Sequence, residues 1–274
     1  MTTPRSVAAV LAVAALAASA AGCGSSAHGL SSGKLKIGIK YDQPGMGLKQ
    51  GYGYAGFDVD VARYVAGKLG VSEGDITWVQ APSSQRETLL STGQVDLIVG
   101  TYSITDARKK KVAFAGPYFL AGQDLLVRSD STISGTEALQ GAKLCSVTGS
   151  TSAQNIAKKV PGVNLQNFST YSECVAGLAA GAVDALTTDD AILAGYASQE
   201  HYKGKVKLVG KPFTKEKYGI GMAKGDKALC QKVTDAIKAM YDDGSWQKAV
   251  DANLGPAGYK PAAGNPPTPE ACAS

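Results

Sequence analysis

The feature that most constrains the fold is an alternation of strand-like and helix-like patterns between residues 34 and 254. In "KLKIGIK" (34–40) every second residue is apolar, as in a strand, whereas in "GFDVDVARYVAGKLG" (56–70) apolar residues recur four apart, as in a helix. Strands separated by helices predict an α/β fold with mostly parallel sheets and helices on their faces. The Pro-rich residues 255–274 are expected to form a loop.

Two stretches, residues 85–101 and 173–189, repeat one pattern of a helix, Gly-x-Val-Asp and a strand, 88 residues apart. The corresponding positions are Gly93 with Gly181, Asp96 with Asp184, and Thr101 with Asp189. Chance is the alternative explanation, because the shared pattern is short. If the repeat is real, two similar lobes each present a polar group at the carboxyl end of a strand, where open α/β sheets bind ligands. The pattern therefore predicts a cleft between two lobes.

The N-terminus has the pattern of an export signal. "MTTPRSVAAVLAVAALAASAAGC" places an apolar run after a basic residue, and the run is too short and too rich in alanine to span a membrane well. It ends in Ala-Gly-Cys, which resembles the lipobox of bacterial lipoproteins, although Ala20 replaces the usual Leu. We expect a signal peptide over residues 1–22, a lipid on Cys23 and a Gly/Ser-rich tether over 23–33. Ordinary secretory cleavage with an incidental Cys23 is the alternative.

Four further cysteines, an even number, suit an oxidising compartment. They are Cys145, Cys174, Cys230 and Cys272. Four cysteines allow three pairings, and the sequence alone does not choose among them; four free buried thiols are the alternative. The chain has no CxxC motif and only two histidines, far apart, so neither a metal site nor a cofactor is expected.

The charge balance excludes a nucleic-acid partner. The formal net charge is +5, with acidic and basic residues interspersed. "ARKKK" (107–111) is the densest basic run, and no aromatic residues alternate with it. Arg108 in this run follows Thr105, a good helix N-cap, so it lies in a first helical turn. Cations avoid that end of a helix unless an anion shares the space, so a bound carboxylate would explain Arg108 better than a surface position does.

Several motifs resemble one protein family. "GFDVDVA", "VDLIVGTYSITDARKKKVAFAGPYF", "GSTSAQN" and "YGIGM" are similar to segments of the family 3 extracellular solute-binding proteins of bacterial ABC importers for polar amino acids. "KYDQPG", "APSSQRETL", "TYSITD" and "TTDDAILAGY" resemble the glutamate-binding branch of that family. The resemblance covers nearly all of residues 34–254.

The resemblance implies a two-lobed fold of the periplasmic-binding-protein type, with each lobe a mostly parallel sheet flanked by helices. Two crossover segments, near residues 119–124 and 215–220, would act as the hinge. Lobe 1 would comprise residues 34–120 and 218–274, and lobe 2 residues 121–217. The disulfides are then expected within lobes, as Cys145–Cys174 and Cys230–Cys272, so that they do not obstruct hinge motion.

The resemblance also implies a set of ligand-binding residues. Arg108 and Ser103 would bind the α-carboxylate of the ligand, and the Thr101 carbonyl and Asp189 would bind its ammonium. Ser150 and Thr151 would donate from a second helix start. The remaining two residues are Arg86 and Lys40, which match basic positions for a side-chain carboxylate. For Lys40 the alternative is a solvated strand end.

The expected function is capture of an acidic amino acid, L-glutamate, by a monomeric, lipid-anchored protein on the extracytoplasmic face of the cell membrane. The protein would deliver this ligand to the permease subunits of an ABC transporter. Glutamine, aspartate and asparagine are alternative ligands. An enzyme resembling cyclohexadienyl dehydratase shares this fold, but it would need a positioned general acid or base, and the predicted cleft contains only charge-pairing groups. We therefore expect no catalytic residues.

Overall fold

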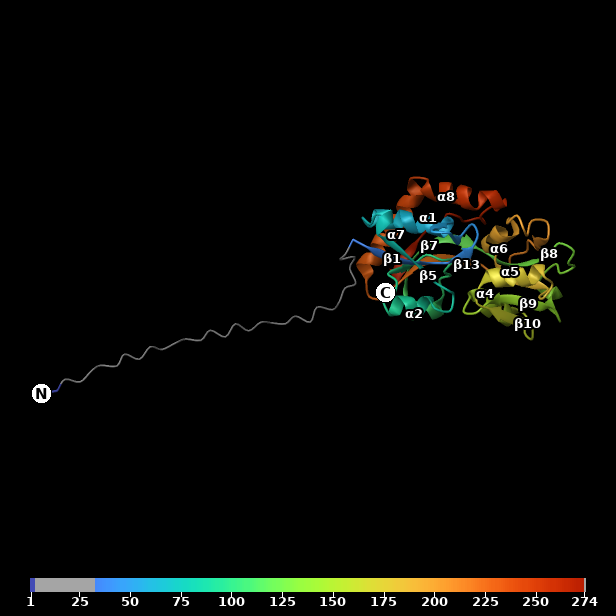
Figure 1. The fold of residues 1–274 in the computed structure, drawn as a ribbon, viewed down its shortest axis with the longest axis horizontal. Coiled ribbons are helices and arrows are strands. Elements are labelled where there is room, and N and C mark those ends of the chain that lie inside the picture. Colours follow the sequence, from blue (N-terminus) through green and yellow to red (C-terminus); the bar gives the residue numbers. More distant parts are fainter. Residues whose placement is uncertain (3–32, 274) are drawn as a thin grey trace.

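The computed structural model describes residues 1–2 and 33–273. The predicted signal peptide beyond Thr2, the lipidation site Cys23 and the tether up to residue 32 lie outside the described residues. Figure 1 shows two lobes side by side, with α1, α7 and α8 in one and α4, α5 and α6 in the other. Among the helices that the structure describes, none has both the length and the apolar character needed to cross a bilayer.

The larger lobe is built on a six-stranded sheet in the order β14-β7-β13-β6-β1-β5. Its strands are β1 (Leu35–Ile39), β5 (Ile76–Gln80), β6 (Leu97–Ile98), β7 (Ala113–Ala121), β13 (Glu216–Met222) and β14 (Glu270–Ala273). Its helices are α1 (Phe57–Lys68), α2 (Arg86–Ser91), α3 (Asp106–Lys109), α7 (Lys227–Asp242) and α8 (Ser245–Asn253). Short 3-10 turns occupy Glu73–Asp75 and Gly255–Ala257.

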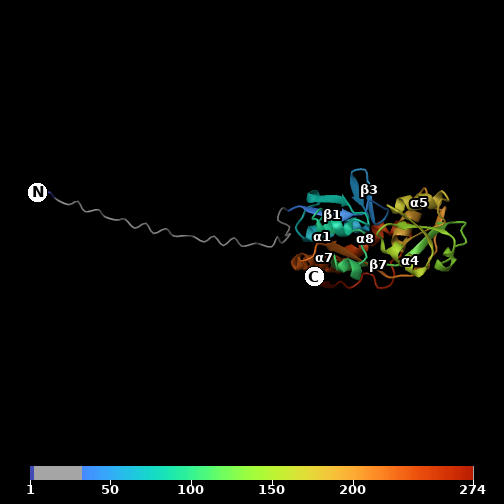
Figure 2. The same ribbon diagram turned by 90° about the horizontal axis from the view of Figure 1, so that it is seen from below.

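A small antiparallel sheet projects from the larger lobe. Its strands are β2 (Asp42–Gln43), β3 (Gly47–Gln50) and β4 (Gly53–Ala55). Figure 2 shows β3 at the side of the lobe that faces α5. The predicted alternation of strands and helices did not include this three-stranded sheet, because its strands are too short to show a period.

The smaller lobe is built on a five-stranded sheet in the order β10-β9-β11-β8-β12. Its strands are β8 (Gln123–Arg128), β9 (Lys143–Val147), β10 (Asn164–Phe168), β11 (Ala185–Asp189) and β12 (Val206–Leu208). Its helices are α4 (Thr151–Lys159), α5 (Tyr171–Ala179) and α6 (Asp190–Ala197), with a 3-10 turn at Thr136–Leu139. The predicted two-lobed α/β architecture is confirmed.

Both sheets are mixed, with more antiparallel pairing than the alternating pattern predicted. β1 runs parallel to β5 and β6, and β9 runs parallel to β10 and β11. β7 passes directly into β8 of the other sheet, and β13 returns beside β7, pairing Glu216 with Ala121. A strand that returns along the path of the outgoing strand is necessarily antiparallel to it. The two crossings between lobes therefore introduce the antiparallel pair of β7 and β13, and the C-terminal strand adds a further antiparallel pair with β7.

The Gly-x-Val-Asp repeat has the same structural role in both lobes. The Asp96 carboxylate accepts from the backbone N–H of Lys36 at 2.7 Å, and the Asp184 carboxylate accepts from that of Lys143 at 2.9 Å. Each aspartate thus ties the start of its own strand to the neighbouring parallel strand. The repeat therefore reflects shared local structure and not chance.

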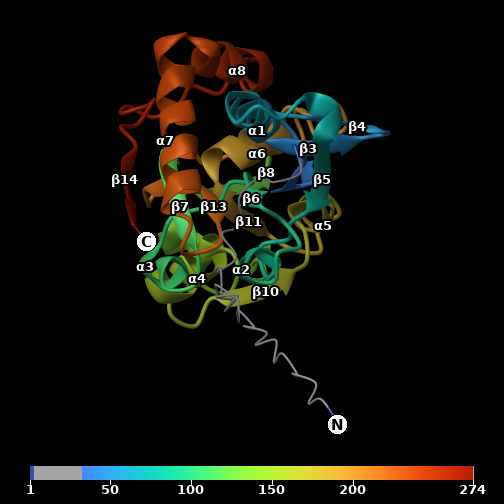
Figure 3. The same cartoon turned by 90° about the vertical axis from the view of Figure 1, so that its left-hand side faces the viewer.

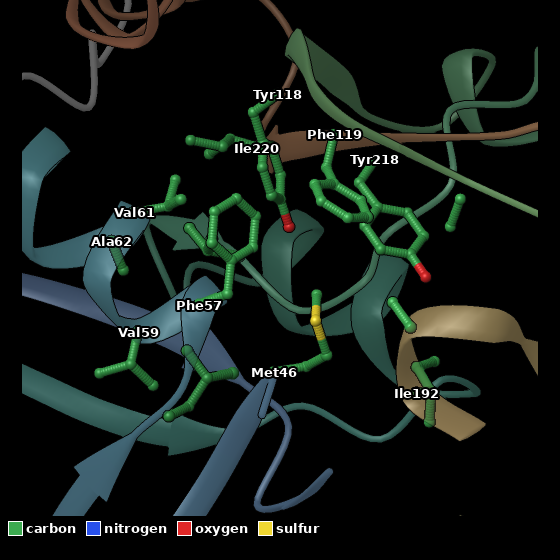
Figure 4. Packing of buried hydrophobic residues seen from close by; sticks show 14 of the residues in the cluster. Met46, Phe57, Val59, Val61, Ala62, Tyr118, Phe119, Ile192, Tyr218 and Ile220 are labelled. Carbon is green, nitrogen blue, oxygen red and sulfur yellow. The ribbon is translucent and has the colours of Figure 1, made fainter. Parts of the chain in front are cut away.

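The core is continuous between the lobes. A single cluster of buried apolar residues includes Phe57 of α1, Phe119 of β7 and Ile192 of α6. Figure 4 shows these residues with Met46 and Tyr218, which belong to the same cluster. The Phe119 and Tyr218 rings, from the two crossing strands, stack with centroids 5.7 Å apart. The strands that connect the lobes are therefore packed into the core.

The expectation of a loop over residues 255–274 was wrong in part. Glu270–Ala273 forms β14, which pairs with the outer edge of β7. Figure 3 shows β14 along the same side of the lobe as α7. The prolines before β14 suppress a strand pattern, and the strand is held in place by a distant partner that a local pattern does not reveal.

Both predicted disulfides are present. Cys145 of β9 is bonded to Cys174 of α5, and Cys230 of α7 is bonded to Cys272 of β14. Each bond lies within one lobe, as expected from the two-lobed fold. The second bond fixes the C-terminal strand to a helix of the larger lobe.

Removing a disulfide is expected to lower stability without changing ligand affinity. The bonds close loops with sequence separations of 29 and 42 residues. Because closing such loops restricts the unfolded chain, replacing Cys230 and Cys272 together by Ala should lower the free energy of unfolding by about 2–4 kcal/mol. Urea unfolding of the variant and the native protein measures this difference. Equal stability of the two proteins would contradict the prediction.

Candidate functional site

The eight predicted ligand-binding residues lie together between the lobes, and all are buried. The larger lobe contributes Lys40, Arg86, Thr101, Ser103 and Arg108, and the smaller lobe contributes Ser150, Thr151 and Asp189. Two contacts join the sets: the hydroxyl oxygens of Ser103 and Thr151 are 3.3 Å apart, and Arg108 Nη2 donates to the Gly149 carbonyl at 3.2 Å. The fold therefore brings the predicted residues of both lobes together where the lobes meet.

The guanidinium of Arg108 is held in place by three acceptors, and its backbone N–H by a fourth. Thr105 caps α3 as predicted, and its side chain accepts from Arg108 N at 3.2 Å. Nη1 donates to the Ser103 carbonyl at 2.8 Å, and Nε lies 3.3 Å from Glu87 Oε1. A guanidinium has five N–H groups, so with Gly149 also bound each terminal nitrogen keeps one N–H. Two parallel N–H groups suit the two oxygens of a carboxylate.

Arg86 is a buried cation at the start of α2. Nη1 donates to the carbonyls of Gly100 at 2.9 Å and Thr101 at 3.4 Å. Within the described part of the chain, Nε has no hydrogen-bond partner and no carboxylate lies within ion-pair distance. Burial, and then the neighbouring charge of Arg108, lowers the pKa of Arg86 to about 10. A buried guanidinium in this situation favours a bound anion.

Tyr102 supports both arginines. Its ring centroid is 4.4 Å from Arg86 Cζ and 4.8 Å from Arg108 Cζ. The ring is fully buried and packs against Phe114 with centroids 4.8 Å apart. One rigid ring therefore fixes the position of two guanidinium groups, a role that the sequence patterns did not predict.

Lys40 is buried, so the alternative of a solvated strand end was wrong. It follows β1 and is 2% exposed. Its Nζ lies 3.9 Å from Asp42 Oδ1 and 5.9 Å from the centroid of the Tyr171 ring. Burial lowers the pKa of Lys40 to about 8; the carboxylate of Asp42 opposes this shift, and Arg86 adds to it.

Asp189 is the acidic counterpart from the smaller lobe. It ends β11, and its carboxylate accepts from the Tyr218 hydroxyl at 2.6 Å and from the Ser152 hydroxyl at 3.5 Å. Burial, and then the charge of Glu216, raises the pKa of Asp189 to about 8. Across residues 33–273, no Lys or Arg side chain forms an ion pair with it. A ligand ammonium beside Asp189 would favour its charged form.

Ser150 and Thr151 form the start of α4. The Ser150 hydroxyl oxygen is the N-cap acceptor for Ala153 N at 3.0 Å. Thr151 is the first residue of the helix, and its hydroxyl contacts that of Ser103 in the larger lobe. The predicted second helix start therefore lies where the lobes meet, and its N-terminal end favours an anion.

Asp58 is a site residue that the sequence analysis missed. It is fully buried in the first turn of α1, and its carboxylate accepts from Thr101 N at 2.8 Å and from the Tyr118 hydroxyl at 2.6 Å. Thr101 has a φ of 45°, a left-handed conformation that costs energy for a β-branched residue. The bond to Asp58 holds this turn. The sequence offered one signal for Asp58: it precedes Ala62 and Ala66 by four and eight residues, so its carboxylate lies on the same buried face of the helix.

Burial also affects the charge of Asp58. It raises the pKa of this carboxyl to about 7, against the opposing effects of the bonds from Tyr118 and Thr101. In the part of the chain that the structure describes, no cluster of three His, Cys, Asp or Glu side chains could hold a metal ion. The chemistry that the cleft offers is recognition of carboxylate and ammonium groups.

Known proteins are similar to this chain in sequence and in fold. The sequence model of one protein family, the bacterial extracellular solute-binding proteins, family 3, matches residues 35–256. The glutamate-binding protein GluB of Corynebacterium efficiens is 45% identical over 251 residues, covering 85% of both chains. The glutamine-binding protein of Geobacillus stearothermophilus is 43% identical over 206 residues, covering 74% of this chain and 78% of that protein.

A solved structure supports the same assignment. An ancestral arginine-binding protein bound to glutamine superposes with a TM-score of 0.76 at 35% identity, covering 81% of this chain and 98% of that one. The similarity thus includes both lobes. From this match over most of its length, the chain belongs to the family 3 bacterial extracellular solute-binding proteins and is a binding protein, not an enzyme.

Proposed function

We propose that this protein captures L-glutamate between its two lobes. The observation that carries the proposal is the charge pattern of the cleft. Arg86 and Arg108 lie over one tyrosine ring, and Asp189 approaches from the other lobe without a cation of its own among the described residues. Glutamate carries two carboxylates and one ammonium, so each charge of the ligand would have an opposite charge.

The assignment of groups follows from the available donors. Arg108, with Ser103 and the start of α4 at Ser150 and Thr151, would bind the α-carboxylate. Asp189 and the Thr101 carbonyl would bind the ammonium. Arg86, with Lys40 nearby, would bind the side-chain carboxylate, because its Nε is a buried donor with no other acceptor among the described residues.

Relatives alone do not decide between glutamate and glutamine. The proteins named for these two ligands are 45% and 43% identical to this chain. The charge of the cleft favours glutamate, since a neutral amide would leave the buried Arg86 without a counter-ion.

The cellular role follows the same proposal. The family is described as extracellular, which places the protein outside the cytoplasm. We infer that Cys23 carries a lipid anchor, that the protein acts as a monomer and that it delivers its ligand to an ABC transporter permease. One relative is named as an ABC transporter glutamine-binding protein, which supports the transporter partner. The lobe boundaries near residues 120 and 217 would form the hinge.

Titration calorimetry with L-glutamate, L-aspartate, L-glutamine and L-asparagine tests the proposal. L-Glutamate should bind most tightly, by about tenfold or more over L-glutamine, because a buried charge pair is lost with the amide. Nuclear magnetic resonance of the mixture after incubation should show the ligand unchanged. Tighter binding of L-glutamine would overturn the choice of ligand, and turnover would overturn the binding role.

A further inference from the structure

Helix α5 begins with two backbone N–H groups that have no hydrogen-bond acceptor in the described part of their own lobe. The first N–H groups of a helix have no partner within the helix. In α5 the Thr170 hydroxyl oxygen accepts from Glu173 N at 3.2 Å, and Glu173 Oε2 accepts from Thr170 N at 2.9 Å. This capping box leaves the amides of the next two residues, Tyr171 and Ser172, free for another acceptor.

The acceptor for both amides is Asp42, which belongs to the opposite lobe. Asp42 lies in β2, and its Oδ2 accepts from Tyr171 N at 3.0 Å and from Ser172 N at 3.4 Å. The Tyr196 hydroxyl of α6 donates its proton to the backbone carbonyl oxygen of Asp42 and lies 3.3 Å from the same carboxylate oxygen. The Asp42 side chain is 13% exposed, so water has little access to these bonds.

We propose that Asp42 is a latch that holds the lobes closed and thereby sets the affinity for every ligand. A carboxylate at a helix N-terminus is stabilised by the helix dipole and by charge-assisted hydrogen bonds. All three donors belong to the smaller lobe, so the bonds form only when the lobes meet. In the open protein, Asp42 and these donors bind water instead. The bonds therefore favour closing only by the difference between their free energy and that of the hydrogen bonds to water that they replace.

Asp42 also lies 3.9 Å from Lys40, and this second neighbour makes an alternative testable. If Asp42 acted only as the counter-ion of Lys40, its removal would leave Lys40 free to attract an anionic ligand. Binding of L-glutamate would then tighten relative to that of L-glutamine. A latch predicts an equal loss of affinity for both ligands, because the lobes close around either one.

The test compares Asp42→Ala with the native full chain, using L-glutamate and L-glutamine as probes. Both dissociation constants should rise by the same factor, about tenfold to thirtyfold, the scale expected for hydrogen bonds to a charged group. Stopped-flow kinetics should place the loss in the dissociation rate, because the encounter occurs with open lobes. Asp42→Asn, which keeps one acceptor oxygen, should lose less.

Tyr196→Phe is the matched variant from the other side of the latch. It removes one donor to Asp42 without changing the surroundings of Lys40, and it should weaken both ligands by a smaller, equal factor. The Asp42 backbone carbonyl remains in Asp42→Ala, so adding Tyr196→Phe to that variant should weaken both ligands further.

The latch inference rests on capture between closing lobes, but not on which amino acid is captured. If L-glutamine alone binds, the ligand proposed above fails and the latch is still measured with L-glutamine. Energy transfer between dyes on the two lobes gives the closed fraction without any ligand, and Asp42→Ala should reduce it. An unchanged closed fraction, or unchanged dissociation rates, would overturn the latch.

Discussion

Replacing Arg86 with Ala is expected to weaken L-glutamate binding by about 2–5 kcal/mol, the cost of breaking a buried charge pair. The proposed ligand carboxylate would remain in a cleft from which water is largely excluded, with no cation in the place of Arg86. L-Glutamine carries no charge at that position and should lose much less. The preference between the two ligands should therefore narrow or invert, as measured by calorimetric titration of both.

Two further variants separate specificity from general damage. Arg86 also donates to the Gly100 and Thr101 carbonyls, so its loss disturbs a turn to which we assign a contact with both ligands. That part of the loss is common to both ligands and cancels in their ratio. Arg108→Ala should weaken both ligands together, because both carry an α-carboxylate. Arg86→Lys keeps the positive charge but loses the forked pair of N–H donors. Its affinity for L-glutamate should therefore lie between those of the native protein and Arg86→Ala.

The glutamate-to-glutamine ratio decides the outcome. An unchanged ratio in Arg86→Ala would refute the assignment of Arg86 to the side-chain carboxylate. It would leave the family assignment intact, because that assignment depends on the match over residues 35–256 and not on this residue.

Features that depend on near neighbours in the chain could be predicted from the sequence. Thr105 caps the helix that begins at Asp106, and its acceptor function spans only three residues to Arg108 N. The alternation of apolar residues located β1, and the four-residue spacing located α1. In each case the physical cause, a period or a cap, lies within one local segment.

Contacts between distant segments could not be predicted in this way. Asp42 and Tyr171 are 129 residues apart, and Asp58 and Thr101 are 43 apart. The sequence shows a carboxylate in each case, but not its donor: the donors to Asp42 come from the other lobe, and those to Asp58 come from distant segments of the same lobe. The same reason hid β14, whose partner is β7, and it hid the position of Tyr102 beneath two arginines.

Gly195→Ala is expected to prevent the lobes from closing. Gly195 lies in α6, and a Cβ atom there would be 1.9 Å from the carbonyl oxygen of Pro44, in the opposite lobe. Backbone on both sides cannot move aside as a flexible side chain can, so the lobes would have to stay further apart. The affinity for L-glutamate and L-glutamine should fall together, by about a hundredfold or more, as an overpacked contact of about 3 kcal/mol predicts.

The fold of the smaller lobe should survive this change, and a second glycine provides the control. Alanine favours a helix by about 1 kcal/mol over glycine, so Gly195→Ala should not lower the unfolding temperature of the ligand-free protein. Gly177→Ala gives the same gain in α5, where the added Cβ would meet only Val183 Cγ2 at an ordinary 3.8 Å. The Gly177→Ala variant should bind both ligands with the affinity of the native protein. If Gly195→Ala bound as tightly as Gly177→Ala, the contact between Pro44 and α6 would not be part of the ligand-binding state, because closing would then tolerate a methyl group at this position.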